Sequence, residues 1–458
     1  MKIPQTPPAF PSLLQNAEAG GHELFNRLAS SFPGGTANGK YRHWDVLRHL
    51  EPPSGLTPEH WWMGLKLSRL GMYQKLPIRD KGGSPFVYAF PDVAQRMVHQ
   101  IDRDASDTIM APREVVSPST RDTYLVKSLV EEAISSSQLE GASTTRDVAK
   151  DMLKLGRAPR DRSERMILNN YRALQFIRQM DETPLTPSIV FELQRMLTEG
   201  TLDGPDAAGR LRRASEHIVV ANDLDGSVLH DPPAASELAP RMESMCAFAN
   251  AADTSEPFIH PVVRSVLLHF WLAYDHPFVD GNGRTARALF YWSMTRRGYW
   301  LAEFLSISRI LKLAPSRYGR AFLYTETDDN DTTYFILFHL RIVIRAIEEL
   351  HQYLARKAAA LEETASLIRR SQSIREELNH RQLALLRHAL EHGTAEYTFR
   401  SHRASHDISY GTARTDLLHL AKLTLLLAHK VGRTFTFRVP QDLGKRLARV
   451  PGHHPLTT

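Results

Sequence analysis

The stretch from Asp275 to Arg287, DHPFVDGNGRTAR, constrains this chain more than any other part of it. Apolar residues recur at helical spacing before this stretch and again after it, which predicts one helix up to His276 and a second helix after Gly283. The proline and the two glycines between these helices allow a tight backbone path. The turn therefore leads into a helix N-terminus, where backbone N–H groups and the helix dipole favour an anion.

The charged side chains of the same stretch indicate a reaction. Arg284 and Arg287 lie one helical turn apart, so their guanidinium groups point the same way. Asp280 can hold a divalent cation, and His276 titrates near neutrality and can serve as a base. An anion cradle with these four groups predicts phosphoryl or nucleotidyl transfer.

This stretch resembles the signature of the Fic family, HPF-x-(D/E)-GNGR-x-x-R, and it matches every defined position. The resemblance implies transfer of AMP from ATP, with Mg²⁺, to a hydroxyl group of a target protein. It implies that His276 is the general base and that Asp280 binds Mg²⁺. The residues that it implies for binding the ATP phosphates are Gly281, Asn282, Gly283, Arg284 and Arg287.

An upstream helix supplies a second motif. An apolar stripe that begins at Tyr124 predicts a helix that ends at Gly141. Spacing alone makes Ser136 and Glu140 solvated residues at a helix end. The segment nevertheless fits the S/T-x-x-x-E-G/N pattern of Fic inhibitory helices, which implies that Glu140 pairs with Arg287 and takes the place of the γ-phosphate.

Two further segments acquire a role through the same resemblance. Short β-prone runs around residues 222–226 predict a hairpin, which on its own fits any surface hairpin. In Fic proteins such a hairpin is a flap that docks the target backbone, so Ile218, Val219 and Val220 are expected in that strand. Tyr318 is the candidate for contact with adenine, and packing in the core is equally compatible with it.

Composition narrows the cellular setting. The N-terminal sequence lacks a charged start followed by an apolar run, and the longest aliphatic runs are far too short to span a bilayer. We therefore expect no secretory signal and no membrane segment. Cys246 is the only cysteine, which excludes an intramolecular disulfide, and its apolar neighbours predict a buried position. These features predict a cytoplasmic protein.

The net charge of +6 is concentrated at one end of the chain. Residues 373–458 contain thirteen Lys and Arg against seven Asp and Glu, so the rest is neutral. Helices followed by a basic hairpin there resemble a winged helix-turn-helix, with Thr424 where such modules usually carry glycine. The candidate DNA contacts are Arg414, Lys430 and Arg433, and dimerisation or protein docking is the alternative use of such a module.

The expected fold is mostly α-helical and has several domains, since 458 residues exceed the roughly 150 of one ordinary domain. We expect a small N-terminal α+β domain whose first 40 residues are a loosely ordered lead-in. An all-helical Fic core with a small β-hairpin flap, a helical connector and the winged helix follow. The predicted ranges are 1–112 for the N-terminal domain, 113–150 for the linker and inhibitory helix, 151–356 for the core, 357–378 for the connector and 379–458 for the winged helix.

The sequence favours an autoinhibited protein adenylyltransferase. Removal of AMP at the same site is an alternative, in which Glu140 positions a water molecule. A DNA-binding transcriptional regulator with a regulatory Fic site is a second alternative. A toxin of a toxin–antitoxin pair is less favoured, because the inhibitor is built into the chain. The resemblance is also compatible with a homodimer.

Overall fold

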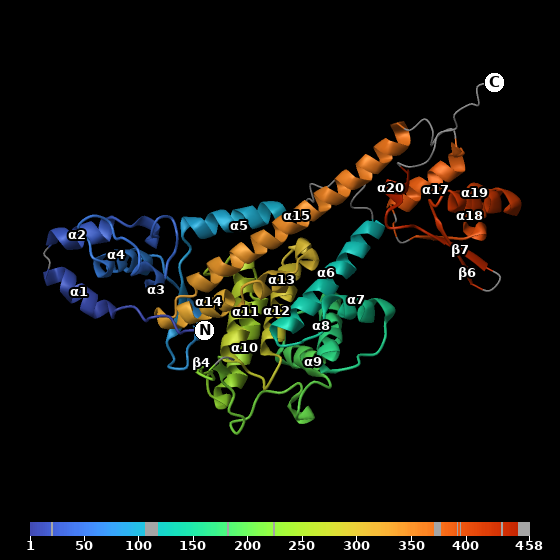
Figure 1. Ribbon diagram of the computed structural model, residues 1–458. Coiled ribbons are helices and arrows are strands. Elements are labelled where there is room, and N and C mark those ends of the chain that lie inside the picture. The colour runs from blue at the N-terminus through green and yellow to red at the C-terminus, as the bar shows by residue number, and fades with distance from the viewer. Residues whose placement is uncertain are drawn as a thin grey trace. The chain divides into compact units, whose positions relative to one another are not determined.

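The computed structural model describes residues 1–19, 22–105, 118–180, 183–222, 225–370, 377–391, 393, 395–431 and 434–447. The chain is mostly helical with a few short strands, as the sequence predicted (Figure 1). It forms two compact units, one from Met1–Ile109 and Thr123–Leu350, the other from Met110–Asp122 and His351–Thr458. Within the described residues, no helix is both long and apolar enough to cross a membrane.

Two consecutive helices, α11 (Pro261–Asp275) and α12 (Asn282–Arg296), form the centre of the first unit. Nearly all their residues are buried, as expected for helices that are surrounded by other elements. Pro261 starts α11 at a position that needs no N–H donor, and His276 ends it with a φ of 44°. Gly281, with a φ of 86°, opens α12. The loop between these helices thus bends sharply at both ends.

Other helices of the unit share one apolar core with this pair, and among them are α6 (Pro118–Leu139), α8 (Arg162–Gln179), α9 (Pro187–Thr198), α10 (Leu238–Asn250), α13 (Ile307–Lys312) and α14 (Pro315–Thr327). Helix α7 (Arg146–Leu155) packs with α6 and α8 in a smaller apolar cluster. Short 3₁₀ turns at Pro33–Gly35, Pro205–Ala207, Ala235–Glu237 and Trp300–Phe304 complete this unit. Burial of Cys246 in α10 is confirmed, and burial raises the pKa of its thiol to about 12.

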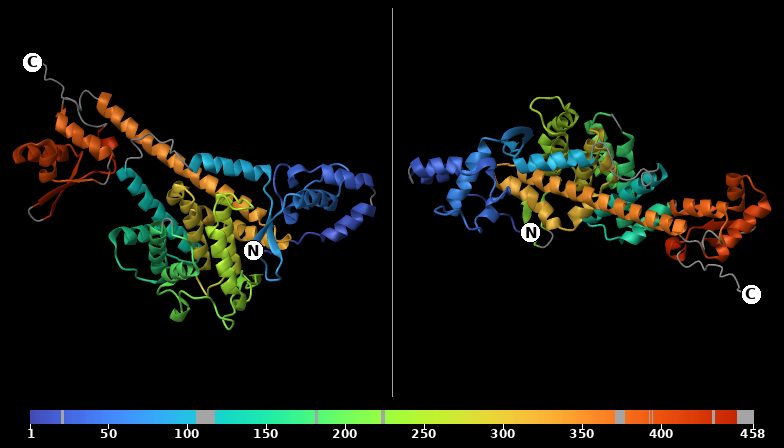
Figure 2. Two further views of the ribbon diagram at one scale, coloured as in Figure 1. Left: turned by 180° about the vertical axis from the view of Figure 1, so that it is seen from behind. Right: turned by 90° about the horizontal axis from the view of Figure 1, so that it is seen from above.

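The N-terminal region is more ordered than predicted. Helices α1 (Phe10–Ala19) and α2 (His22–Ser30) bury Leu13 and Leu28 against α4 (Pro58–Leu70) in a small separate core, which also holds the single turn α3 (Trp44–Leu47). The prediction of a loosely ordered lead-in is therefore wrong, because a few well-spaced apolar residues suffice for packing. The strands β1 (Gln74–Arg79) and β2 (Pro85–Tyr88) pair as an antiparallel hairpin, which agrees with the expected α+β character of this region. Helix α5 (Asp92–Ala105) then lies beside the first half of α15 (Thr333–Arg370) (Figures 1 and 2).

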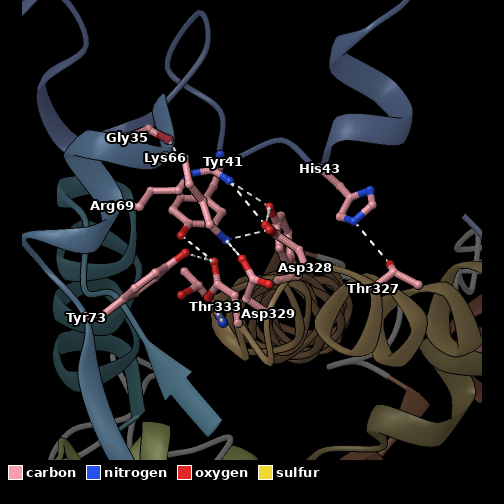
Figure 3. A network of polar contacts seen from close by, with 12 residues as sticks. Gly35, Tyr41, His43, Lys66, Arg69, Tyr73, Thr327, Asp328, Asp329 and Thr333 are labelled. Atoms are coloured by element: carbon pink, nitrogen blue, oxygen red, sulfur yellow. Dashed lines mark hydrogen bonds and ion pairs between the residues drawn. The ribbon is translucent and has the colours of Figure 1, made fainter. Parts of the chain in front are cut away.

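A buried polar network fixes the N-terminal helices to the end of α14 (Figure 3). Lys66 of α4 lies 2.5 Å from Asp328, and the Arg69 guanidinium also reaches that carboxylate. The Tyr41 hydroxyl donates to Asp331 at 2.6 Å. Buried charges are stable only when they are paired, so this network holds the two regions together.

The second unit has its own apolar core and a three-stranded sheet of order β5-β7-β6. Its elements in chain order are α17 (His380–Glu391), β5 (Glu396–Tyr397), α18 (Phe399–His406), α19 (Tyr410–Lys422), β6 (Leu427–Val431), β7 (Thr434–Arg438) and α20 (Leu443–Leu447). The Ser409 hydroxyl caps α19 by accepting from the Thr412 N–H at 3.1 Å, as predicted. Because α7 continues across residue 150 and α15 across residue 356, two predicted domain boundaries fall inside helices.

Thr424 follows α19 with a φ of 59°, in the left-handed region. A β-branched residue is strained there, which explains why similar modules carry glycine at this point.

Thr424→Gly is expected to stabilise the second unit by about 1 kcal/mol, because it removes this strain. Amide hydrogen exchange of α19 should become slower in the full-length variant. Thr415→Gly, inside α19, is the control and should accelerate that exchange, since glycine weakens a helix interior. Faster exchange in both variants would show that Thr424 is not strained.

Candidate active site

His276 lies at the C-terminal end of α11, on the wall of a cavity of about 220 Å³. Its Nδ1 is 3.3 Å from the carbonyl oxygen of Ala273. A carbonyl oxygen can only accept a hydrogen bond, so Nδ1 carries the proton. This leaves Nε2 as the atom that can accept a proton from a substrate.

The surroundings of His276 keep its ring neutral. Burial, together with the nearby positive charges of His230 and Arg212, lowers the pKa of His276 to about 4. The imidazole is therefore neutral at pH 7, with a proton on Nδ1 and none on Nε2, which is the state that a general base requires.

The anion cradle is the first turn of α12. The first hydrogen bond into the helix runs from the Thr285 N–H to the Gly281 carbonyl at 2.9 Å, so the N–H groups before Thr285 face outward from the helix start. The Asn282 side chain is committed elsewhere, since it accepts from the Phe278 N–H at 2.9 Å and donates to the Phe278 carbonyl at 2.8 Å. Asn282 therefore offers an anion only its backbone N–H.

The Glu140 carboxylate lies in this cradle. Arg287 donates from Nη2 to Glu140 Oε1 at 2.9 Å and from Nε to the Ser136 hydroxyl at 2.8 Å. A Cβ atom built on Gly283 would lie 2.2 Å from the same carboxylate oxygen. The structure thus brings the predicted pair together and places the carboxylate directly over the first turn of α12.

Asp280 and Arg284 lie at the edge of the cradle. Asp280 accepts from the Gly281 N–H at 2.5 Å, and Arg284 Nη2 donates to its other carboxylate oxygen at 3.3 Å. Arg284 is fully buried and also donates to the Leu197 carbonyl at 2.8 Å. No group of three or more His, Cys, Asp or Glu residues suited to a metal ion occurs in the described ranges. Asp280 therefore offers a metal ion one carboxylate without a cluster of further acidic or histidine ligands in the described residues, and its side chain is about one third exposed.

The flap lies across the cavity from α14. Strand β3 (Val220–Ala221) pairs with β4 (Val228–His230), so the hairpin exists, but its strand begins at Val220. Ile218 and Val219 precede the strand, because the short β4 pairs with only two residues of β3. Tyr318 of α14 lines the opposite wall, and its hydroxyl is 2.8 Å from His269 Nε2.

The structure brings only some of the predicted site residues into the cavity wall, and its lining does not include Ser136, Ile218, Val219, Asp280, Gly281, Asn282, Arg284 or Arg287. Those that line the cavity are His276, Gly283, Glu140, Tyr318 and Val220. Arg414 in α19 and Lys430 in β6 are exposed in the second unit, and Arg433 lies outside the described residues.

Comparison with known proteins agrees with this geometry. Residues 184–294 match the Fic/DOC family model, and this range contains the whole stretch from Asp275 to Arg287. The chain therefore contains a segment that is similar to Fic domains.

The similar proteins align with only part of this chain. "Protein adenylyltransferase Fic" of Drosophila erecta is 27% identical over 56% of this chain and 49% of its own length. The Nematostella vectensis protein of the same name is 27% identical over 44% of this chain and 47% of its own length. The chain thus matches about half the length of these relatives. A Fic family protein from Desulfovibrio desulfuricans G20 aligns over 76% of this chain and 95% of its own at 17% identity, with a TM-score of 0.48.

Sequence spacing did not identify three residues that shape the Fic site. His230 lines the cavity, bonded to Glu326 at 2.8 Å and to the Tyr274 carbonyl at 2.7 Å. Burial lowers the pKa of His230, but Glu326 more than offsets this, so the net shift is upward. Gln194 donates to the Asp280 carbonyl at 2.9 Å, and Arg212 to the His276 carbonyl at 3.0 Å. These residues come from separate segments, so no local pattern links them.

We expect the imidazole of His276 to titrate near pH 4 rather than near 6.5, because burial disfavours its charged form. The Cε1–H signal in NMR spectra of the full chain measures this pKa, and its absence from His276→Ala assigns it. A midpoint near 6.5 would contradict the buried, neutral ring.

Proposed function

We propose that this chain is an adenylyltransferase that moves AMP from ATP to a hydroxyl side chain of a target protein. The name of its curated relatives supports this activity. The observation that most supports this proposal is that His276, a neutral base, lies in the same cavity as a helix N-terminus that can bind an anion. The Glu140 carboxylate occupies that helix N-terminus.

The proposed reaction is a single displacement. The target hydroxyl oxygen forms a bond to the α-phosphorus of ATP while His276 Nε2 takes the hydroxyl proton. The bond from the α-phosphorus to its bridging oxygen breaks, and pyrophosphate leaves. The N–H groups at the start of α12, with Arg284 and Arg287, hold the phosphates in line.

Mg²⁺ fits the residues present. Mg²⁺ usually binds through one or two carboxylates together with substrate phosphates and waters, rather than in a cage of protein ligands. Asp280 is a partly exposed carboxylate at the rim of the cradle, so it can supply that ligand. The ion would neutralise phosphate charge, and Tyr318 would contact the adenine.

Glu140 makes this site autoinhibited in our proposal. Its carboxylate takes the bond from Arg287 that a γ-phosphate needs and adds negative charge where that phosphate would lie. ATP must therefore displace the partly exposed Glu140 carboxylate from the buried Arg287 in order to bind productively.

Glu140→Gly is expected to raise AMP transfer about 10-fold to 100-fold, since a charge-assisted hydrogen bond contributes about 1.5–3 kcal/mol. Adding His276→Ala should lower it again by about 10² or more, because the base is lost. Incorporation of label from α-labelled ATP with Mg²⁺ measures both effects.

Glu192→Gly is the control, because Glu192 is an exposed carboxylate that pairs only with neighbouring Arg195. It should leave incorporation at the wild-type level. Equal labelling of wild type and Glu140→Gly would refute the inhibitory role, and labelling by the His276→Ala double variant would refute the base.

Removal of AMP is a second candidate, since Glu140 and His276 line the same cavity. There Glu140 would orient a water molecule toward the phosphodiester. One variant distinguishes addition of AMP from its removal. If the chain adds AMP, Glu140→Gly should increase transfer. If the chain removes AMP, Glu140→Gly should abolish the release of AMP from a modified protein.

We further propose that the second unit is a winged helix that binds DNA. Its order of helix, strand, two helices and hairpin fits that module, and its excess positive charge fits a polyanion. A cytoplasmic location, assembly into a homodimer and the division into domains also remain proposals.

A duplex from upstream of its own gene should bind with an affinity that falls steeply as salt rises. Arg414→Ala and Lys430→Ala should each reduce the salt slope by about 1, if each contacts one phosphate. Arg172→Ala, at an exposed position in α8, is the control. A mobility shift that none of these variants changes would place DNA binding elsewhere.

A further inference from the structure

A second and larger cavity, of about 620 Å³, lies on the other side of α14. Tyr318 and Glu326 of α14 line the Fic cavity, whereas Arg320 and Tyr324 of the same helix line the second one. The remaining walls come from residues 39–46, α5 and α15, all within the first unit. No role assigned to the Fic site above uses this cavity.

The cavity is strongly basic. Five cationic side chains line it, and no carboxylate does so among the described residues. They are Lys40, Arg42, Arg317, Arg320 and Arg341. None of the five forms an ion pair with a carboxylate in the described part of the chain. Like charges crowded in this way repel one another and attract an anion.

Three carboxylates close to this cavity already have hydrogen-bond or ion-pair partners. Asp328 pairs with Lys66, and Asp331 accepts from the Tyr41 and Tyr73 hydroxyls, in the network of Figure 3. Asp45 accepts from the Gln5 N–H at 3.0 Å. None of these acids lines the cavity, so the lining keeps an excess of positive charge, of which Asp45 offsets a part through its effect on His43 and Tyr324.

Two guanidinium groups of the cavity each keep one buried N–H group without an acceptor among the described residues. The Nε atoms of Arg42 and Arg320 are buried and have no hydrogen-bond partner within the described ranges. A buried donor without an acceptor costs about 1–3 kcal/mol. Partial loss of hydration also lowers the pKa of Arg341. An anion in the cavity would supply the missing acceptors.

The other walls are flat and apolar. The His43 ring stacks on Tyr324 with centroids 4.4 Å apart and an interplanar angle of 15°. Burial lowers the pKa of His43 to about 4, so it presents an uncharged ring. Phe338 and Met97 add apolar surface. Such walls suit a planar ring beside an anionic group.

We propose that this cavity binds a phosphorylated small molecule that carries a planar ring, of the size of a nucleoside diphosphate. The arginines hold the phosphates and the aromatic walls hold the ring. The volume lies within the roughly 300–1,000 Å³ of small-molecule sites. The site is separate from the Fic site and does not depend on adenylyl transfer.

The test is calorimetric titration of the full chain with ADP and with inorganic pyrophosphate. Arg42→Gln/Arg320→Gln should weaken ADP binding at one site about tenfold or more, because two charge-assisted contacts are lost. Since Arg42 supports the fold through its backbone carbonyl, which accepts from Arg69, this variant should keep its unfolding midpoint. Arg317→Gln, at an exposed position, should weaken ADP binding severalfold without any risk to folding.

Two further variants separate the cavities. Gly283→Val closes the Fic cradle and should leave this binding event intact, and Arg172→Gln on α8 is the matched arginine control. Loss of all ADP binding in Gly283→Val, or unchanged binding in both cavity variants, would overturn the proposal. Weaker binding of pyrophosphate than of ADP supports a role for the ring, and equal binding of the two overturns that role.

Discussion

A carboxylate held over the N-terminus of a buried helix is the interaction on which the site depends. Helix α12 lies in the middle of the core, so the N–H groups of its first turn meet protein rather than bulk water. Arg287 is fully buried beside them, and removing its partner would leave an unpaired charge at a cost of several kcal/mol. This position therefore favours an anion, which the Glu140 carboxylate supplies in the structure, and in the proposed function a nucleotide phosphate would compete with it for the same groups.

Helix α14 contributes to the walls of both the Fic cavity and the basic cavity. One face carries Tyr318 toward the Fic site, and the other carries Arg320 toward the basic cavity. Its C-terminal end is fixed by the buried pairing of Asp328 with Lys66. The two sites thus share a structural element although they share no lining residue.

The sequence predicted the parts of the site that are local in the chain. Positions of glycine, proline and apolar residues predicted that His276 ends one helix and that the cradle opens the next. The pairing of Glu140 with Arg287 came only from family resemblance, because these residues are 147 positions apart and spacing does not encode contacts at that distance. His230 and Gln194 were missed for the same reason. Helices α1 and α2 were missed because a Pro- and Gly-rich composition concealed a few well-placed apolar residues.

In the proposed transfer of AMP, the low basicity of His276 determines which groups can control the reaction. A histidine with a pKa of about 4 cannot ionise a hydroxyl group in advance, so it takes the proton only as the oxygen–phosphorus bond forms. Most of the rate enhancement must then come from aligning the phosphates and stabilising their charge. Those functions belong to the first turn of α12 and to Arg287, the groups that Glu140 occupies. A single carboxylate can therefore suppress the reaction without touching the base.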